Sequence, residues 1–221
     1  MDNRLPFVIY GAGGFAREVA WLVEECAPTG TSLGELCFID DNPATWDKPL
    51  NGVAVLRPES IFQRHQGAGC VIAVGNPGVR ERIDQKILAA GLRPTTVVHP
   101  RVEKSRWIEI GDGTIICAGS VLTTNIVIGR HVHINLNCTI GHDVMLGDFT
   151  TLAPGVHVSG FVHLGRRVSV GTGAVFINGS IDRPLVVGDD AVIGAGACVI
   201  RDVPAGATVG GVPAKPLSSS R

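Results

Sequence analysis

In the second half of the chain, hydrophobic residues recur with a period that belongs to neither an α-helix nor an ordinary strand. From residue 110 onward an apolar residue stands at every sixth position. The twelve positions are Ile110, Ile116, Leu122, Ile128, Ile134, Ile140, Leu146, Leu152, Val158, Leu164, Val170 and Phe176. The phase then slips by five residues at the segment DRPLV and resumes at Val187, Ile193 and Val199. Because helical apolar positions recur every three to four residues, this run cannot be an amphipathic helix.

A longer period in the same region indicates how the hexads are organised. Glycine follows the apolar position at residues 111, 129, 147 and 165, a spacing of 18 residues. Three short strands would therefore form one coil, and coils would stack about 4.8 Å apart. The sixth residue then points inward and fills a triangular prism. The pattern predicts a parallel β-helix of about five coils, capped by a degenerate first coil in the segment TTVVHPRVEKSRW.

The first part of the chain follows a different pattern, in which short apolar runs alternate with segments of helical spacing. The predicted elements are strands in FVIY, LCFID and CVIAVG, and helices in REVAWLVEEC and RERIDQKILAAG. Strand–helix–strand order favours a small parallel sheet with right-handed crossovers. We therefore expect two domains: residues 1–94 form an α/β half-Rossmann domain, and residues 95–221 form an all-β parallel β-helix.

A glycine-rich loop lies between the first predicted strand and helix. In GAGGFA, residues Gly11, Gly13 and Ala16 fit the fingerprint G-x-G-x-x-G/A, with Gly14 beside them. Such a loop presents backbone N–H groups and a helix N-terminus to a phosphate. Residues expected on the same sheet edge are Asp40 and Asp41, as acceptors for a ribose or base, and Gly75 and Asn76, near a diphosphate or sugar.

The same loop is compatible with two alternative roles. It could bind NAD, or it could be a purely structural tight turn. About 90 residues hold only half of a dinucleotide-binding fold, so a nucleotide diphosphate joined to a sugar is favoured over NAD.

Composition and charge exclude several classes of protein. Hydrophobic residues make up 45% and charged residues 18% of the chain, which is typical of a folded domain. A formal charge of -1 argues against nucleic acid as a partner. The N-terminus has no signal-peptide pattern, and no apolar stretch is long enough for a membrane span. Six cysteines without a CxxC pair favour reduced thiols in a cytoplasmic protein.

Specific motifs give the chain a family resemblance. The hexads IGRHVH, IGHDVM and IGAGAC, with the tail VPAGATVGGVPAKPL, resemble the left-handed β-helix acyltransferases. The left hand rests on this resemblance alone, because ordinary crossover chirality predicts the opposite. Together with VIYGAGGFAREV, nearly the whole chain is similar to nucleotide-activated amino-sugar N-acetyltransferases. The resemblance implies acetyl-CoA as co-substrate, no metal, a GDP- or UDP-linked 4-amino sugar as acceptor, and a homotrimer with shared active sites.

The pair His142–Asp143 is the candidate catalytic centre. Acetylation of an amine requires the amine to lose a proton, and an imidazole is a suitable base near neutral pH. The inward position of this hexad is Ile140, so His142 need not face the core. Asp143 would raise the basicity of the imidazole. Seven histidines occur in the chain, so an ordinary surface histidine is the alternative.

The family resemblance assigns further roles. It makes His142 the general base, and it has Asn135, seven positions earlier, orient the imidazole or the sugar. It places the backbone N–H of Gly160 on the oxyanion of the intermediate. The remaining acetyl-CoA contacts that it implies are Thr172 and Ala195 for the pantetheine and Lys215 for a phosphate. Gly160 could instead be a plain turn residue and Lys215 a solvated cation.

Three other functions remain open from the sequence. An O-acetyltransferase acting on a sugar hydroxyl, of the sialic-acid type, needs the same base and the same thioester. A zinc hydratase like the γ-type carbonic anhydrases would use imidazoles, for which His131, His133, His157 and His163 are candidates. A non-catalytic nucleotide-sugar sensor would bind without turnover. No nucleophile–base signature is present, so we expect direct attack of the acceptor on acetyl-CoA without an acyl-enzyme.

Overall fold

The computed structural model describes residues 6–26 and 36–217 and divides the chain into two compact units, Met1–His99 and Pro100–Arg221. The predicted boundary after residue 94 lies five residues earlier than this division. Two contacts account for the difference. Strand β6 (Val97–Val98) packs on helix α1 (Gly14–Cys26), and the His99 ring lies 5.4 Å from that of Trp21. The segment after residue 94 therefore belongs with the first unit.

The first unit is a parallel sheet with strand order β3-β2-β1-β4-β5. Its strands are β1 (Phe7–Tyr10), β2 (Leu36–Ile39), β3 (Val55–Leu56), β4 (Gly69–Ile72) and β5 (Arg93–Pro94). Besides α1 it has the 3₁₀ turn η1 (Pro43–Thr45) and helices α2 (Pro58–Phe62) and α3 (Pro77–Ala89). Helix α3 begins before the predicted start because Asn76 caps it and Pro77 takes its first position. The predicted half-Rossmann fold is confirmed.

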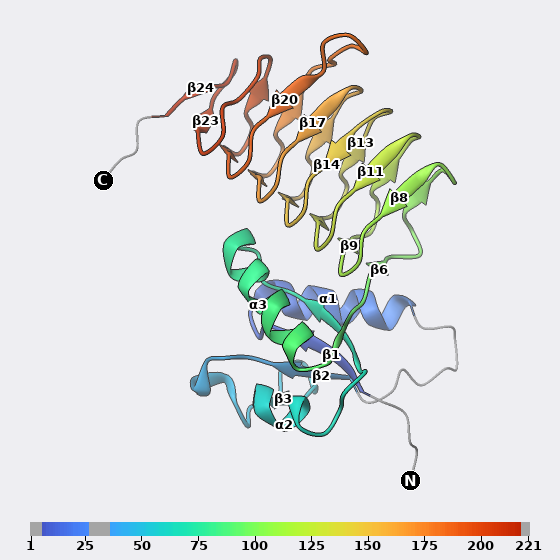
Figure 1. The fold of residues 1–221 in the computed structure, drawn as a ribbon, viewed down its shortest axis with the longest axis vertical. Helices are drawn as coiled ribbons and strands as arrows, with labels where there is room; N and C mark the ends of the chain where they lie inside the picture. The colour runs from blue at the N-terminus through green and yellow to red at the C-terminus, as the bar shows by residue number, and fades with distance from the viewer. Residues whose placement is uncertain (1–5, 27–35, 218–221) are drawn as a thin grey trace. The chain divides into compact units, whose positions relative to one another are not determined.

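The second unit is a left-handed parallel β-helix with three flat faces (Figure 1). The first face consists of β7 (Glu103–Lys104), β10 (Val121–Leu122), β13 (Thr139–Ile140), β16 (His157–Val158), β19 (Val175–Phe176) and β22 (Cys198–Val199). The second consists of β8 (Ile108–Ile110), β11 (Ile126–Ile128), β14 (Met145–Leu146), β17 (Val162–Leu164) and β20 (Leu185–Val187). The third consists of β9 (Ile115–Ile116), β12 (His133–Ile134), β15 (Thr151–Leu152), β18 (Ser169–Val170), β21 (Val192–Ile193), β23 (Thr208–Gly210) and the antiparallel β24 (Lys215–Pro216).

The interior of the prism is filled by the residues that carry the six-residue period. Every such residue from Ile116 to Phe176 is at most 3% exposed, and only Ile110, in the first coil, is partly exposed. Strands pair with the strand 18 residues away, as in Ile140↔Val158. Each coil therefore buries three apolar side chains against the coils above and below, which is the main stabilising interaction of this unit.

The five-residue slip in the period forms a loop between β19 and β20, which projects beyond the corners of the preceding coils (Figure 1). Reciprocal backbone hydrogen bonds of 2.9 and 3.1 Å between Ser180 and Arg183 close the loop. Its two ends rest on the coil below, where Gly179 N–H donates to the Gly160 carbonyl and Leu185 N–H to that of Phe161, both at 3.0 Å. The insertion thus interrupts the sequence period while the coils remain stacked.

Candidate active site

His142 lies at the corner between the first and second faces, in the turn from β13 to β14. We call this corner the His142 edge: it comprises residues 124–125, 142–143, 160–161 and 178–184 in successive coils. Backbone hydrogen bonds join its levels, with Asp143 N–H donating to the Thr124 carbonyl at 3.2 Å and Phe161 N–H to that of His142 at 3.1 Å. Residues one coil apart therefore lie in contact along this edge.

The imidazole of His142 is paired with the neighbouring carboxylate. Its Nδ1 lies 2.8 Å from Oδ2 of Asp143, and Asn125 Nδ2 donates to Oδ1 of the same carboxylate at 3.3 Å. The hydrogen bond from His142, aided by that from Asn125, lowers the pKa of Asp143 despite some desolvation. An ionised carboxylate only accepts hydrogen bonds, so Nδ1 carries a proton and Nε2 is the basic nitrogen. Adjacent side chains meet because Asp143 is in the left-handed conformation, with φ 57°.

The basic nitrogen of His142 packs over Gly160 in the next coil. A Cβ atom at Gly160 would lie only 2.6 Å from both Nε2 and Cε1 of the imidazole. The Phe161 ring meets the imidazole edge-on, with centroids 5.0 Å apart. The His142 side chain is nevertheless 51% exposed. Gly160 thus lets the ring lie against the backbone while solvent and substrates can still reach it.

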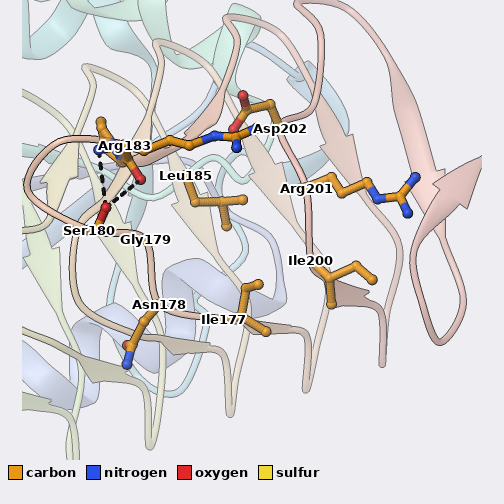
Figure 2. A pocket seen from close by; sticks show the side chains of 10 residues that line it. Ile177, Asn178, Gly179, Ser180, Arg183, Leu185, Ile200, Arg201 and Asp202 are labelled. Atoms are coloured by element: carbon orange, nitrogen blue, oxygen red, sulfur yellow. Dashed lines mark hydrogen bonds between the residues drawn. The ribbon is translucent and has the colours of Figure 1, made fainter.

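The backbone N–H of Gly160, the predicted oxyanion donor, already has a partner. It donates to Oδ1 of Asn178, 3.0 Å away. Asn178 also borders a cavity of about 570 Å³ beneath the inserted loop, with Arg183, Arg201 and Asp202 among its lining residues (Figure 2). An acyl oxygen could use the Gly160 N–H only if Asn178 moved. Sequence reasoning missed Asn178, although its 18-residue spacing from Gly160 is visible in the repeat.

The other residues assigned by resemblance lie away from the His142 edge. Asn135, Thr172 and Ala195 all fall in turns from the third face to the first. Asn135 is 9% exposed, and its Nδ2 donates to the Leu152 carbonyl at 2.7 Å. Lys215 is exposed in β24, beside the third face. Within one chain the structure therefore does not bring these residues together with His142.

The glycine loop has the conformation that its fingerprint predicts. Gly11 has φ 116°, and a Cβ there would lie 3.0 Å from the Ala73 carbonyl oxygen, so β1 and the end of β4 approach closely. Ala16 is fully buried against the sheet. A Cβ at Gly13 would meet nothing within 4 Å, and Gly14 begins helix α1. The space over Gly13 is the space that a phosphate would need.

The two aspartates after β2 have different roles. Asp40 accepts from the backbone N–H of Ala12 at 2.7 Å and from that of Asn42 at 2.8 Å, so it ties the glycine loop to its own turn. Asp41 accepts from the Tyr10 hydroxyl and pairs with Lys86 Nζ, both at 2.7 Å. Burial alone would raise the pKa of Asp41, but the hydrogen bonds from Lys86 and Tyr10 lower it overall. Sequence reasoning missed Lys86, which is 45 residues from its partner.

The turn after β4 is also engaged within the fold. Asn76 Oδ1 accepts from the N–H of Val79 at 2.9 Å, and the Gly75 carbonyl accepts from the fully buried Arg80 at 3.1 Å. A Cβ at Gly75 would meet nothing within 4 Å. The predicted contact of Gly75 and Asn76 with a diphosphate or sugar stays a prediction.

Replacing Gly13 with leucine tests the glycine loop. Because the added side chain would enter open space, the fold should be retained, and the side chain should obstruct a phosphate at the helix N-terminus. If the loop binds the nucleotide sugar that the family resemblance implies, KM for that substrate should rise at least about tenfold, with KM for acetyl-CoA and Tm unchanged. Steady-state kinetics with each substrate varied in turn measures this. Equal effects on both KM values would contradict the assignment.

Comparison with known proteins identifies the family. Residues 6–87 match the PglD N-terminal domain. The chain is 35% identical to the GDP-perosamine N-acetyltransferase of Escherichia coli O157:H7 over 96% of each protein. The chain belongs to the amino-sugar N-acetyltransferases of the hexapeptide-repeat family. This acetyltransferase also matches the structure of WeeI from Acinetobacter baumannii AYE, with TM-score 0.90, 36% identity, and coverage of 96% of this chain and 100% of that one.

A further solved relative was determined with two ligands bound. The structure of PerB from Caulobacter crescentus in complex with CoA and GDP-perosamine has a TM-score of 0.84 to this acetyltransferase and 27% identity. The match covers 96% of this chain and 97% of PerB. The predicted family, fold and use of acetyl-CoA are confirmed.

Two structural findings concern metals and membranes. Across residues 6–26 and 36–217, the acetyltransferase has no group of three or more His, Cys, Asp and Glu side chains arranged to hold a metal ion. None of the helices in the same part of the chain is long and apolar enough to cross a bilayer.

Proposed function

We propose that this acetyltransferase transfers acetyl from acetyl-CoA to the 4-amino group of a GDP-linked amino sugar, with GDP-perosamine as the first candidate. The observation that carries the proposal is the exposed His142–Asp143 pair, in which the imidazole can act as a base. The chain that holds this pair is 35% identical to a GDP-perosamine N-acetyltransferase. A UDP-linked 4-amino sugar is the alternative acceptor. In this proposal the glycine loop at Gly11 and Gly13 holds the nucleotide diphosphate.

The reaction follows from the chemistry of the pair. The amine nitrogen attacks the thioester carbonyl carbon and forms the C–N bond, while the π electrons move to oxygen. His142 Nε2 takes the proton that the amine loses, and Asp143 stabilises the resulting imidazolium through Nδ1–H. Collapse of the intermediate breaks the C–S bond. The CoA thiolate leaves and receives a proton from the imidazolium or from water, which restores the base.

We further infer a homotrimer with active sites shared between subunits. The two sets of assigned residues support this, because His142 and Gly160 lie at one corner of the prism and Thr172 and Ala195 at another. A groove between two prisms would bring the corners together. Apolar side chains exposed on the second face add support, because a neighbouring subunit could cover them. Val127, Met145 and Val186 are 40%, 47% and 42% exposed.

The mass of the purified protein tests this assembly. A trimer has about three times the chain mass of 23.1 kDa. A single-chain mass with full activity would contradict shared sites.

Location in the cytoplasm is a proposal as well. It is supported by six cysteines, none of which forms a disulfide, because a reducing compartment keeps thiols in that state. Cell fractionation with an activity assay tests it, and activity confined to an extracellular fraction would contradict it.

The experiment that tests the function compares acceptors. GDP-perosamine, a UDP-linked 4-amino sugar and the 4-hydroxy analogue of each are supplied with acetyl-CoA, and CoA release and the acetylated product are measured. We expect kcat/KM to be highest for GDP-perosamine. Faster acetylation of a hydroxy analogue would instead establish an O-acetyltransferase. Binding of the nucleotide sugars without any turnover would instead indicate a non-catalytic nucleotide-sugar sensor.

A further inference from the structure

The oxygen of the Asn178 side-chain amide makes a hydrogen bond within the described part of the fold, and its nitrogen does not. Its Oδ1 accepts the N–H of Gly160 at 3.0 Å, which fixes the orientation of the amide. Its Nδ2 must then point away from that backbone, and no described residue accepts a hydrogen bond from it. The residue is exposed and borders the 570 Å³ cavity. Figure 2 shows its amide nitrogen at the tip of the side chain, directed away from Arg183 and Asp202.

This open donor lies beside the position where the reaction would occur. Nε2 of His142 packs over Gly160, and the backbone nitrogen of the same glycine anchors Asn178. An amine bound to Nε2 attacks a carbonyl carbon held about 3 Å away. The carbonyl oxygen therefore falls in the neighbourhood of Gly160, where the backbone N–H is already engaged and the Asn178 amide still has hydrogen atoms to donate.

Comparison with another corner shows that an amide is unnecessary for holding the coils together. Asp148 Oδ1 accepts the N–H of Arg130 at 2.9 Å, one coil away, and Asp189 Oδ1 accepts that of Arg166 at 2.8 Å. A carboxylate serves as the cap at both positions. Asparagine at position 178 keeps the same accepting oxygen and adds two N–H donors.

We propose that Asn178 is a catalytic residue whose Nδ2 donates a hydrogen bond to the thioester oxygen as it becomes negative. The proposal rests on the proposed function. As the amine nitrogen forms its bond to the carbonyl carbon, the oxygen receives the π electrons and Nδ2–H stabilises the charge. When the C–S bond breaks, the carbonyl reforms and the CoA thiolate departs. The Gly160 N–H acts through Asn178 by fixing the amide.

Asn178→Asp separates the two roles of this side chain. The aspartate retains an oxygen for the Gly160 N–H and removes both donors. We expect kcat to fall at least about tenfold with Tm unchanged, a smaller loss than for a buried oxyanion donor because the site is exposed. Asn178→Ala also removes the donors, but it releases the Gly160 N–H for the acyl oxygen, so we expect a smaller loss than in Asn178→Asp. The matched control Asp148→Asn makes the reverse exchange at a corner away from His142 and should leave kcat within about twofold.

A spectroscopic measurement makes the test independent of the acceptor. Acetyl-CoA labelled with ¹³C at the thioester carbonyl is bound to the protein, and difference infrared spectra report the carbonyl stretch. The proposal expects a lower frequency in the wild type than in Asn178→Asp, in which the Gly160 N–H stays engaged. Equal frequencies in these two proteins, or kcat of Asn178→Asp within threefold of wild type, would overturn it. Absence of turnover by the wild type with every nucleotide-linked amino sugar would instead overturn the proposed function.

Discussion

His142→Ala is expected to lower kcat by about 10² or more, because the variant lacks the nitrogen that is placed to take the amine proton at this edge. Asp143, held by Asn125, cannot substitute, since a carboxylate is a weaker base than an imidazole even without the hydrogen bond from His142. The nucleotide sugar is proposed to bind through the glycine loop, so its Kd should stay unchanged. Steady-state kinetics and isothermal titration calorimetry measure the two quantities.

The matched control for this variant is His157→Ala. His157 lies in β16 of the same unit, is also exposed, and contacts Thr139 Oγ1 through Nδ1 at 2.8 Å. It lies on the first face and is not one of the residues of the His142 edge, so its replacement should leave kcat within about twofold. A loss of less than threefold in His142→Ala would remove this histidine as the principal base. The amine would then lose its proton to another acceptor, such as water or the departing thiolate.

The β-helix was predictable because the same short-range requirement, one buried apolar side chain, recurs in every hexad. Each hexad places one apolar side chain inward, and twelve repetitions make the period visible in a single sequence. The glycine loop was predictable for a related reason, since a tight turn between a strand and a helix constrains consecutive residues such as Gly11 and Gly13. The domain boundary was less visible, because the ring contact between Trp21 and His99 joins positions far apart in the chain.

The site was only partly predictable because its contacts join different coils. His142 and Asp143 are adjacent in sequence, so their pairing could be anticipated. Asn125 and Gly160 contact them from the neighbouring coils, and Asn178 contacts Gly160 from the coil beyond, with an 18-residue separation at each step. Applying that separation to the polar residues, as well as to the apolar ones, would have placed all three at this edge. The pairing of Asp41 with Lys86 follows no period and needed the structure.

Gly160→Ala is expected to lower kcat by about 10² while leaving the fold intact. The new Cβ would lie 2.6 Å from Nε2 and Cε1 of His142, a distance that real Cβ atoms do not show, so the imidazole must move. The nearest atoms all belong to this one side chain, which is half exposed and can rotate outward. Displacement of the base by about 1 Å is enough to cost such a factor. Tm should change little, and kcat is measured under saturating substrates.

A double-mutant cycle shows whether Gly160 acts through the histidine. If the alanine lowers kcat only by displacing His142, the double variant Gly160→Ala/His142→Ala should be no slower than His142→Ala alone. A further loss in the double variant would mean that the added methyl group also lowers kcat independently of the histidine. Additive losses would refute displacement of the imidazole as the mechanism. The cycle thus separates displacement of the imidazole from any other effect of the added methyl group.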